Sequence, residues 1–395
     1  MGELKTRDIK MGQLKRGLKS RHLNMIAIGG AIGTGLFLAS GGTVSQAGPG
    51  GALVAYTLIG IMVYFLMTSL GEMATYMPVT GSFETYASRF FDPALGFALG
   101  WNYWYNWAIT VAVEMVAGAM IMKYWFPGVP SIIWSISFLV LLFGLNMLSA
   151  KAYGESEFWF ASIKVVAVLV FLVVGVAMIF GIMGGHNVGL SNFTFLDSKS
   201  GAKGPFPYGF KAILMVFLIA GFSFQGTELI GIAAGESEEP EKNVPKAIKS
   251  VFWRIIIFYL GALFIISALI PFTEAGVTTS SFTIIFQRAG IAGAASLMNA
   301  VVLTSVLSCG NSGMYAASRM LYAMSREGRA PKAFSKVNRK GVPVNALYIT
   351  TLVASASFLV GLYAQETSIY VVSSSFRFSW VYCMGRNCVM SLSFP

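Results

Sequence analysis

The sequence contains few charged residues. Asp, Glu, Lys and Arg make up 11% of its 395 residues, whereas soluble globular domains carry about a quarter. Hydrophobic residues make up 55%, and the mean hydropathy is +0.68. A soluble protein of this length needs a charged and polar surface that this composition does not supply. The composition therefore excludes aqueous enzymes, nucleic-acid-binding proteins and disordered proteins, and it predicts an integral membrane protein.

Histidine and cysteine are also scarce. The histidines are His22 and His186, and the cysteines are Cys309, Cys383 and Cys388. Three cysteines without metal-ligand spacing predict neither a disulfide framework nor a metal site. No nucleophile–base set accompanies them, so we expect neither an enzyme nor a bound cofactor.

Long uncharged stretches predict membrane spans, because about 20 apolar residues cross a bilayer core. Residues 22–71 contain no Asp, Glu, Lys or Arg, and the turn signal Gly48-Pro49-Gly50-Gly51 divides them into two spans. Further candidates bring the total to nine: about 95–125, 131–149, 156–183, 209–235, 250–271, 283–318 and 344–364. We therefore expect an all-α, polytopic helical bundle over residues 22–370, after a basic tail over residues 1–21.

The net charge of +11 follows the positive-inside pattern. With the N-terminus in the cytoplasm, 20 of the 28 Lys and Arg residues fall in inner segments and five fall in outer segments. This asymmetry predicts a multi-pass protein of the cytoplasmic membrane with a cytoplasmic N-terminus. The basic excess is thus a topology signal in a lipid bilayer, and no nucleic-acid partner is expected.

Two spans carry glycine-rich polar interruptions near the middle of the membrane. Span 1 contains Gly33-Thr34-Gly35-Leu36, and span 6 contains Gly226-Thr227-Glu228-Leu229. Gly29 and Gly33 alone fit close helix packing, but the density of glycine favours an unwound segment. Spans 1 and 6 are five apart and run in opposite directions. Matched interruptions of this kind indicate an inverted-repeat transporter with its site between them.

Unwound helices in lipid predict the class of ligand. Irregular backbone is tolerated at this depth only where it lines a cavity. Freed N–H groups at a helix N-terminus bind an anion such as a carboxylate, and freed carbonyl groups bind a cation such as an ammonium. A zwitterionic amino acid carries both groups, so we expect an amino acid substrate.

Three ionisable side chains fall well inside spans: Glu114, Lys164 and Glu228. Charges at this depth are costly, which favours a functional role. Lys164 and Glu228 lie at nearly the same depth, which makes them candidates for an ion pair. Lys164 then either exchanges the coupling proton during transport or forms a purely structural ion pair. Glu114 is a candidate partner for a cationic substrate side chain.

Other features keep two interpretations. The aromatic run Trp101, Tyr103, Trp104, Tyr105 and Trp107 is interpreted as an interfacial belt. Phe222 is either an ordinary apolar residue or a gate over the substrate. The polar residues of span 8 form helix–helix hydrogen bonds or line the cavity: Asn299, Ser305, Ser308, Asn311 and Ser312.

Several motifs together resemble the bacterial amino acid permease family of the amino acid–polyamine–organocation superfamily. They are Gly33-Thr34-Gly35, Ser45-Gln46-Ala47-Gly48-Pro49-Gly50-Gly51, Phe222-Ser223-Phe224-Gln225-Gly226-Thr227-Glu228, Asn243-Val244-Pro245 and Gly310-Asn311-Ser312-Gly313. The run Gly100-Trp101-Asn102-Tyr103-Trp104-Tyr105-Asn106-Trp107 favours a lysine-transporting member. The resemblance implies a five-plus-five inverted-repeat fold of the LeuT type, with discontinuous helices 1 and 6, and import by proton symport.

The resemblance also implies site residues. Ile32, Gly33, Thr34 and Gly35 would hold the substrate carboxylate, and the segment Phe222-Ser223-Phe224-Gln225 would hold its α-ammonium. Lys164 matches the lysine that replaces a sodium ion in proton-coupled relatives. Glu228 would meet the lysine side chain or lie on the proton path.

The C-terminal segment departs from the family pattern. Residues 371–395 contain no apolar run of 18 residues and resemble a truncated or frame-shifted end. The alternatives to lysine import are a permease for arginine, histidine or an aromatic amino acid, an amino-acid-binding membrane sensor, and a non-functional truncated permease.

Overall fold

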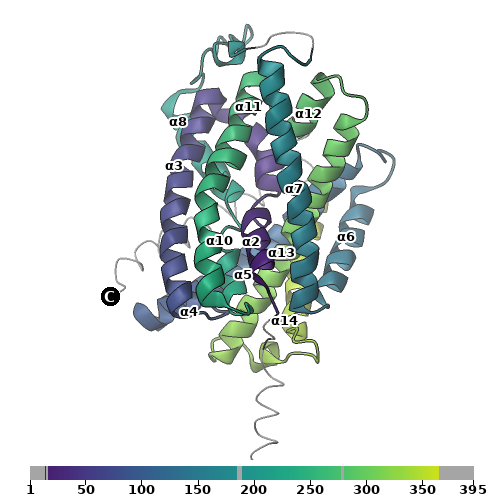
Figure 1. Cartoon of the computed structure of the whole chain (residues 1–395). Coiled ribbons are helices and arrows are strands. Elements are labelled where there is room, and N and C mark those ends of the chain that lie inside the picture. Colours follow the sequence, from purple (N-terminus) through teal and green to yellow (C-terminus); the bar gives the residue numbers. More distant parts are fainter. Residues whose placement is uncertain (1–13, 15–16, 185–188, 277–279, 364–395) are drawn as a thin grey trace, which may run out of the picture.

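The chain folds into a bundle of helices (Figure 1). The computed structural model describes residues 14, 17–184, 189–276 and 280–363. Within these residues, β pairing is confined to two isolated bridges, one of which joins Leu18 to Ser237. The predicted all-α class is therefore confirmed, while the C-terminal segment 371–395 lies outside the described residues.

The long helices follow the predicted spans. The α-helices are α2 (Ser20–Gly29), α3 (Ser40–Tyr76), α4 (Phe83–Phe90), α5 (Pro93–Met122), α6 (Ser131–Asn146), α7 (Ala150–Ile179), α8 (Gly209–Ser223), α9 (Leu229–Ala234), α10 (Pro240–Arg254), α11 (Ala262–Leu269), α12 (Ser281–Arg288), α13 (Ala294–Arg326) and α14 (Val344–Tyr363). Two π-helices, η1 (Gly35–Ala39) and η3 (Ile255–Gly261), and two 3₁₀ turns, η2 (Ser191–Phe193) and η4 (Lys332–Ser335), complete the order.

Five helical stretches of the described residues are long and apolar enough to cross a membrane. They are 35–76, 93–122, 150–179, 240–269 and 294–326. α6, α8 and the start of α14 are shorter apolar helices. The helices agree with a multi-pass architecture, in which backbone polar groups are satisfied within each span.

Side chains fix where the long helices begin. α5 starts at Pro93, and Asp92 Oδ1 accepts hydrogen bonds from the N–H groups of Ala94 (2.7 Å) and Leu95 (3.1 Å). The hydroxyl of Ser149 caps the start of α7 in the same way. Proline and short polar residues at these positions satisfy N–H groups that have no partner within the helix.

The short helix α2 lies inside the bundle. It contacts α7 and α10, while α5 and α13 pack against each other. Figure 1 shows α2 between α7 and α10. Residues 29–38, which contain the irregular backbone after α2, are all buried, so this backbone is shielded from lipid.

The predicted division between spans 1 and 2 is confirmed as a kink. Gly48 has φ +76° and ψ 172° in the middle of the stretch 35–76. A Cβ atom on Gly48 would lie 2.1 Å from Pro207 Cδ. The carbonyl oxygen of Pro205 accepts hydrogen bonds from Gly50 N (2.8 Å) and Gly51 N (3.4 Å). The loop before α8 thus caps the helix that resumes after the kink.

Two details of the predicted spans are wrong. The segment 283–318 is not one helix, because α12 and α13 are separated by Gly290 and Gly293, both with positive φ. The charge pattern predicts an inner loop over residues 236–254 that includes Arg254, but Arg254 ends α10 and only 1% of its surface is exposed. A basic residue usually indicates a solvent-exposed loop, but the Arg254 side chain is buried within the helical bundle.

The interfacial-belt interpretation is wrong for two of the five aromatic residues. Trp107 and Tyr103 are buried against the core, and the Tyr103 ring packs edge-to-face on Phe83 at 4.6 Å. Trp101, Trp104 and Tyr105 are more exposed. α5 is a central helix, so side chains on its inner face pack within the protein rather than at the membrane surface.

Candidate functional site

Both predicted helix interruptions are present. α2 ends at Gly29 and helical backbone resumes as η1 at Gly35, while α8 ends at Ser223 and α9 begins at Leu229. Within the second break, Gly226 has φ +97°. This left-handed conformation favours glycine because it has no Cβ atom.

The two breaks touch each other. A Cβ atom on Gly226 would lie 2.4 Å from the carbonyl oxygen of Gly30, and one on Gly35 would lie 2.4 Å from Ser223 Cα. The Ser223 hydroxyl donates a hydrogen bond to the Gly35 carbonyl (2.9 Å). Glycine is therefore required at these positions for the two backbones to approach.

A small cavity of about 10 Å³ lies at these breaks, with room for about one water molecule. Five of the predicted site residues line it: Gly33, Gly35, Glu114, Phe222 and Gln225. Ala31, Thr110 and Cys309 complete the wall. The cavity is thus formed by both unwound segments together with α5 and α13.

Glu114 provides the carboxylate of this cavity. Thr34 Oγ1 donates a hydrogen bond to Glu114 Oε2, and 1% of Glu114 is exposed. Among the ion pairs of the described residues, none involves Glu114. A buried carboxylate without an ion-pair partner is stabilised when a cationic group binds beside it.

Gln225 and Thr110 form a second polar contact in the wall. Gln225 Nε2 donates to Thr110 Oγ1 at 2.9 Å, and Gln225 Oε1 has no hydrogen-bond partner among the described residues. Thr110 was not predicted. Its position one helical turn before Glu114 is a signal that would have placed it on the same face of α5.

Other predicted residues support the breaks instead of lining the cavity. Ile32 is buried and apolar. The Ser223 hydroxyl also contacts Tyr56 OH at 2.7 Å. The Phe224 ring stacks on Tyr259 at 4.3 Å, and the Tyr259 hydroxyl donates to the Ala31 carbonyl at 2.8 Å. These contacts hold the first break against the second.

Glu228 holds the backbone of the second break. Its Oε2 accepts a hydrogen bond from Gly226 N at 2.9 Å, and its Oε1 accepts one from Tyr103 OH at 3.3 Å. It is absent from the cavity wall. A carboxylate that accepts a backbone N–H within the break stabilises the unwound conformation.

The predicted pair between Lys164 and Glu228 is wrong. Lys164 Nζ donates to the Gly29 carbonyl at 2.7 Å, and its closest carboxylate oxygen is Glu157 Oε1 at 3.8 Å. The two residues lie at a similar depth, but their side chains point to different neighbours. Lys164 faces α2, whereas Glu228 faces its own backbone and α5.

Glu157 and Arg254 were missed. Glu157 precedes Lys164 by seven residues, or two helical turns, so the spacing alone places both on one face of α7. Arg254 interacts electrostatically with Glu228 and Tyr259. None of its guanidinium nitrogens has a hydrogen-bond partner among the described residues.

Four polar residues of span 8 form helix–helix hydrogen bonds. Asn299 Nδ2 donates to the Ile121 carbonyl of α5 at 3.3 Å. Ser308 Oγ donates to Glu157 Oε1 (2.6 Å), and Ser312 Oγ accepts from Tyr153 OH (3.0 Å). Asn311 Oδ1 accepts from Asn146 Nδ2 at 2.8 Å. None of these four residues lies in the cavity wall, so the cavity-lining interpretation does not hold for them.

Comparison with known proteins identifies the family to which the chain belongs. A sequence profile of the amino acid permease family matches residues 22–391. Lysine-specific permease LysP of Escherichia coli is 56% identical over 363 residues, covering 90% of this chain and 73% of the relative. LysP of Lactococcus lactis subsp. cremoris is 55% identical over 374 residues, covering 92% and 73%.

A further relative has another named substrate. Histidine permease HisP of Lactococcus lactis subsp. cremoris is 50% identical over 371 residues, covering 92% of this chain and 76% of the relative. All three relatives are permeases rather than enzymes. The matched range includes both helix breaks and the cavity between them. The chain therefore belongs to the amino acid permease family, whose members are multi-pass membrane transporters.

Proposed function

We propose that this permease imports lysine across the cytoplasmic membrane by proton symport, with its N-terminus in the cytoplasm. The observation that carries the proposal is the buried Glu114 carboxylate, which lies without an ion-pair partner in the wall of the cavity between the helix breaks. The similarity to two lysine-specific permeases supports the same substrate. The 20-to-5 distribution of basic residues supports the orientation.

The helix breaks supply groups for the amino acid backbone. The N–H groups of Gly33, Thr34 and Gly35, at the start of η1, would bind the substrate carboxylate. Carbonyl groups around Phe222, at the end of α8, would bind the α-ammonium. This use of spans 1 and 6 fits a five-plus-five inverted repeat. Phe222, which lines the cavity, would act as its gate.

Glu114 would bind the ε-ammonium of lysine. It lines the cavity, whereas Glu228 hydrogen-bonds Gly226 and Tyr103 outside the wall. An ionised carboxylate in a buried site gains from a cationic partner. We therefore assign the side-chain contact to Glu114 and a backbone-positioning role to Glu228.

Counterflow in proteoliposomes tests the substrate assignment. Vesicles holding the full chain and unlabelled lysine are placed in labelled lysine, and unlabelled competitors are added outside. We expect lysine to compete at least about tenfold better than histidine, arginine or an aromatic amino acid. Equal or stronger competition by histidine would favour a histidine permease, and binding without counterflow would favour the sensor alternative.

Lys164→Ala is expected to uncouple transport. Lys164 Nζ donates to the carbonyl of Gly29, the last residue of α2, so its protonation state is linked to the helix that precedes the first break. Accumulation driven by a pH gradient should fall at least about tenfold, while lysine counterflow should stay within about threefold. The exposed Lys123→Ala serves as the control. Full gradient-driven accumulation by Lys164→Ala would remove the coupling role.

A further inference from the structure

Lys164 shares a buried site with a second ionisable residue, Glu157. Both side chains are fully buried, with 0% exposed surface. Lys164 Nζ lies 3.8 Å from Glu157 Oε1. Both residues lie on α7, and their spacing of two turns places them on the face toward α2 and α13.

Neither partner is fully satisfied. Among the described residues, the Lys164 ammonium donates one hydrogen bond, to the Gly29 carbonyl at 2.7 Å, whereas a lysine ammonium can donate three. Glu157 Oε1 accepts from Ser308, but Glu157 Oε2 has no hydrogen-bond partner among the described residues. A permanent structural ion pair in an apolar interior needs nearly complete hydrogen bonding to offset desolvation. This pair lacks it.

We propose that Glu157 is the acceptor of the coupling proton that Lys164 carries. This inference rests on the proposed proton symport and adds a residue to it. One N–H bond of the Lys164 ammonium breaks and one O–H bond forms on Glu157, so an ion pair becomes a neutral amine and a neutral carboxylic acid. The pair closes from 3.8 Å to hydrogen-bond distance for this step. Glu157 then releases the proton to water and regains its charge.

Hydroxyl groups beside Glu157 indicate the direction in which its proton would leave. Ser308 donates to it at 2.6 Å, and Ser312, which also interacts with Glu157, accepts from Tyr153 OH at 3.0 Å. These hydroxyl groups lead along α7 and α13 toward the start of α7. The other titratable groups that interact with the pair are Tyr153, Cys309 and Glu114.

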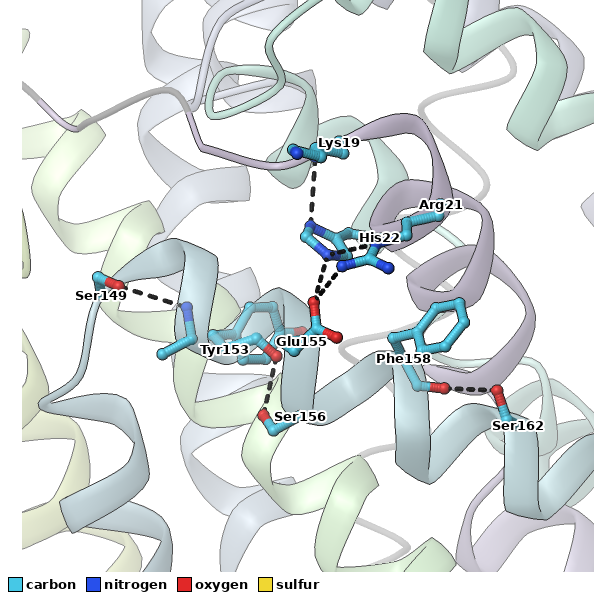
Figure 2. Close-up of polar contacts among 10 residues, drawn as sticks. Lys19, Arg21, His22, Ser149, Tyr153, Glu155, Ser156, Phe158 and Ser162 are labelled. Atoms are coloured by element: carbon cyan, nitrogen blue, oxygen red, sulfur yellow. Dashed lines mark hydrogen bonds and ion pairs between the residues drawn. The ribbon is translucent and has the colours of Figure 1, made fainter.

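The proton step also changes how α2 is held. The charged Lys164 binds the Gly29 carbonyl at one end of α2. At the other end, Glu155 of α7 pairs with Arg21 (2.6 Å) and His22 (3.1 Å), as Figure 2 shows. Neutralising Lys164 weakens the contact beside the first break and leaves the distant contact intact. Proton transfer to Glu157 therefore frees the substrate-binding end of α2.

Glu157→Gln tests the inference, because it keeps the size of the side chain and removes the proton acceptor. In proteoliposomes holding the full chain, lysine accumulation driven by a pH gradient should fall at least about tenfold. Lysine counterflow, which moves no net protons, should stay within about threefold. Glu157→Asp should restore part of the gradient-driven accumulation. The matched control is Glu241→Gln, the same change at an exposed glutamate of α10.

The outcomes separate this inference from the proposed function. Parental accumulation by Glu157→Gln would overturn the role of Glu157 and leave proton symport intact. Absence of gradient-driven accumulation in the parent, with counterflow present, would overturn proton symport and with it the acceptor. If Glu157→Gln does not fold, Ser308→Ala is tested in its place. Severalfold slower coupled uptake with unchanged counterflow would support Glu157 as the proton acceptor. Unchanged coupled uptake would refute that role.

Discussion

Replacing Gly226 with alanine is expected to lower lysine uptake at least about 100-fold. Gly226 has φ +97°, and an added Cβ atom would lie 2.4 Å from the carbonyl oxygen of Gly30. The left-handed conformation alone costs an L-residue about 1–2 kcal/mol. The clash is with backbone, so no side-chain rotation relieves it. Initial rates of lysine uptake, normalised to folded protein in the membrane, measure the effect.

Gly144→Ala is the matched control for this substitution. Gly144 lies in α6, and a Cβ atom there would meet nothing within 4 Å. Alanine is also the better helix former, so uptake should stay within about twofold of the parent. Near-parental uptake by Gly226→Ala would show that contact between the two breaks is not needed for transport.

Glu114→Gln is expected to lower lysine uptake at least about 30-fold. The substitution removes the carboxylate from the cavity wall and keeps the hydrogen-bonding shape toward Thr34. Leaving one partner of a buried charge pair unpaired costs about 2–5 kcal/mol, and 2 kcal/mol corresponds to about 30-fold. Uptake and counterflow of labelled lysine provide the measurement.

A neutral analogue separates a charge effect from general damage. Norleucine has an uncharged side chain of similar length. In Glu114→Gln, unlabelled norleucine should therefore inhibit uptake of labelled lysine more strongly, compared with unlabelled lysine, than it does in the parent. Glu228→Gln should instead impair both compounds to the same degree, because Glu228 holds Gly226 outside the cavity wall. If Glu228→Gln selectively lost lysine uptake while Glu114→Gln kept it, Glu228 would be the residue that binds the lysine side chain and Glu114 would not.

The helix breaks were predictable from sequence because their cause is local. Glycine at Gly33, Gly35 and Gly226 is needed for backbone conformation and close approach, and dense glycine in an apolar run is visible without a fold. The kink at Gly48 was predictable for the same reason. The chemistry expected of unwound segments follows from their freed backbone groups.

Side-chain partners were not predictable because they depend on the rotation of each helix. α7 is apolar on nearly every side, so its hydrophobic pattern gives no preferred face for Lys164. Depth alone paired Lys164 with Glu228, although Glu157 lies two turns away on the same helix. Tyr103 was misplaced for the same reason, since an aromatic residue near a helix end can face lipid or the core.

The most direct test of the account is lysine accumulation in proteoliposomes under an imposed pH gradient. With the outside acidic, the full chain should concentrate labelled lysine inside, and a protonophore should abolish the accumulation. An equal accumulation with and without the gradient, in vesicles that still exchange lysine, would contradict proton symport.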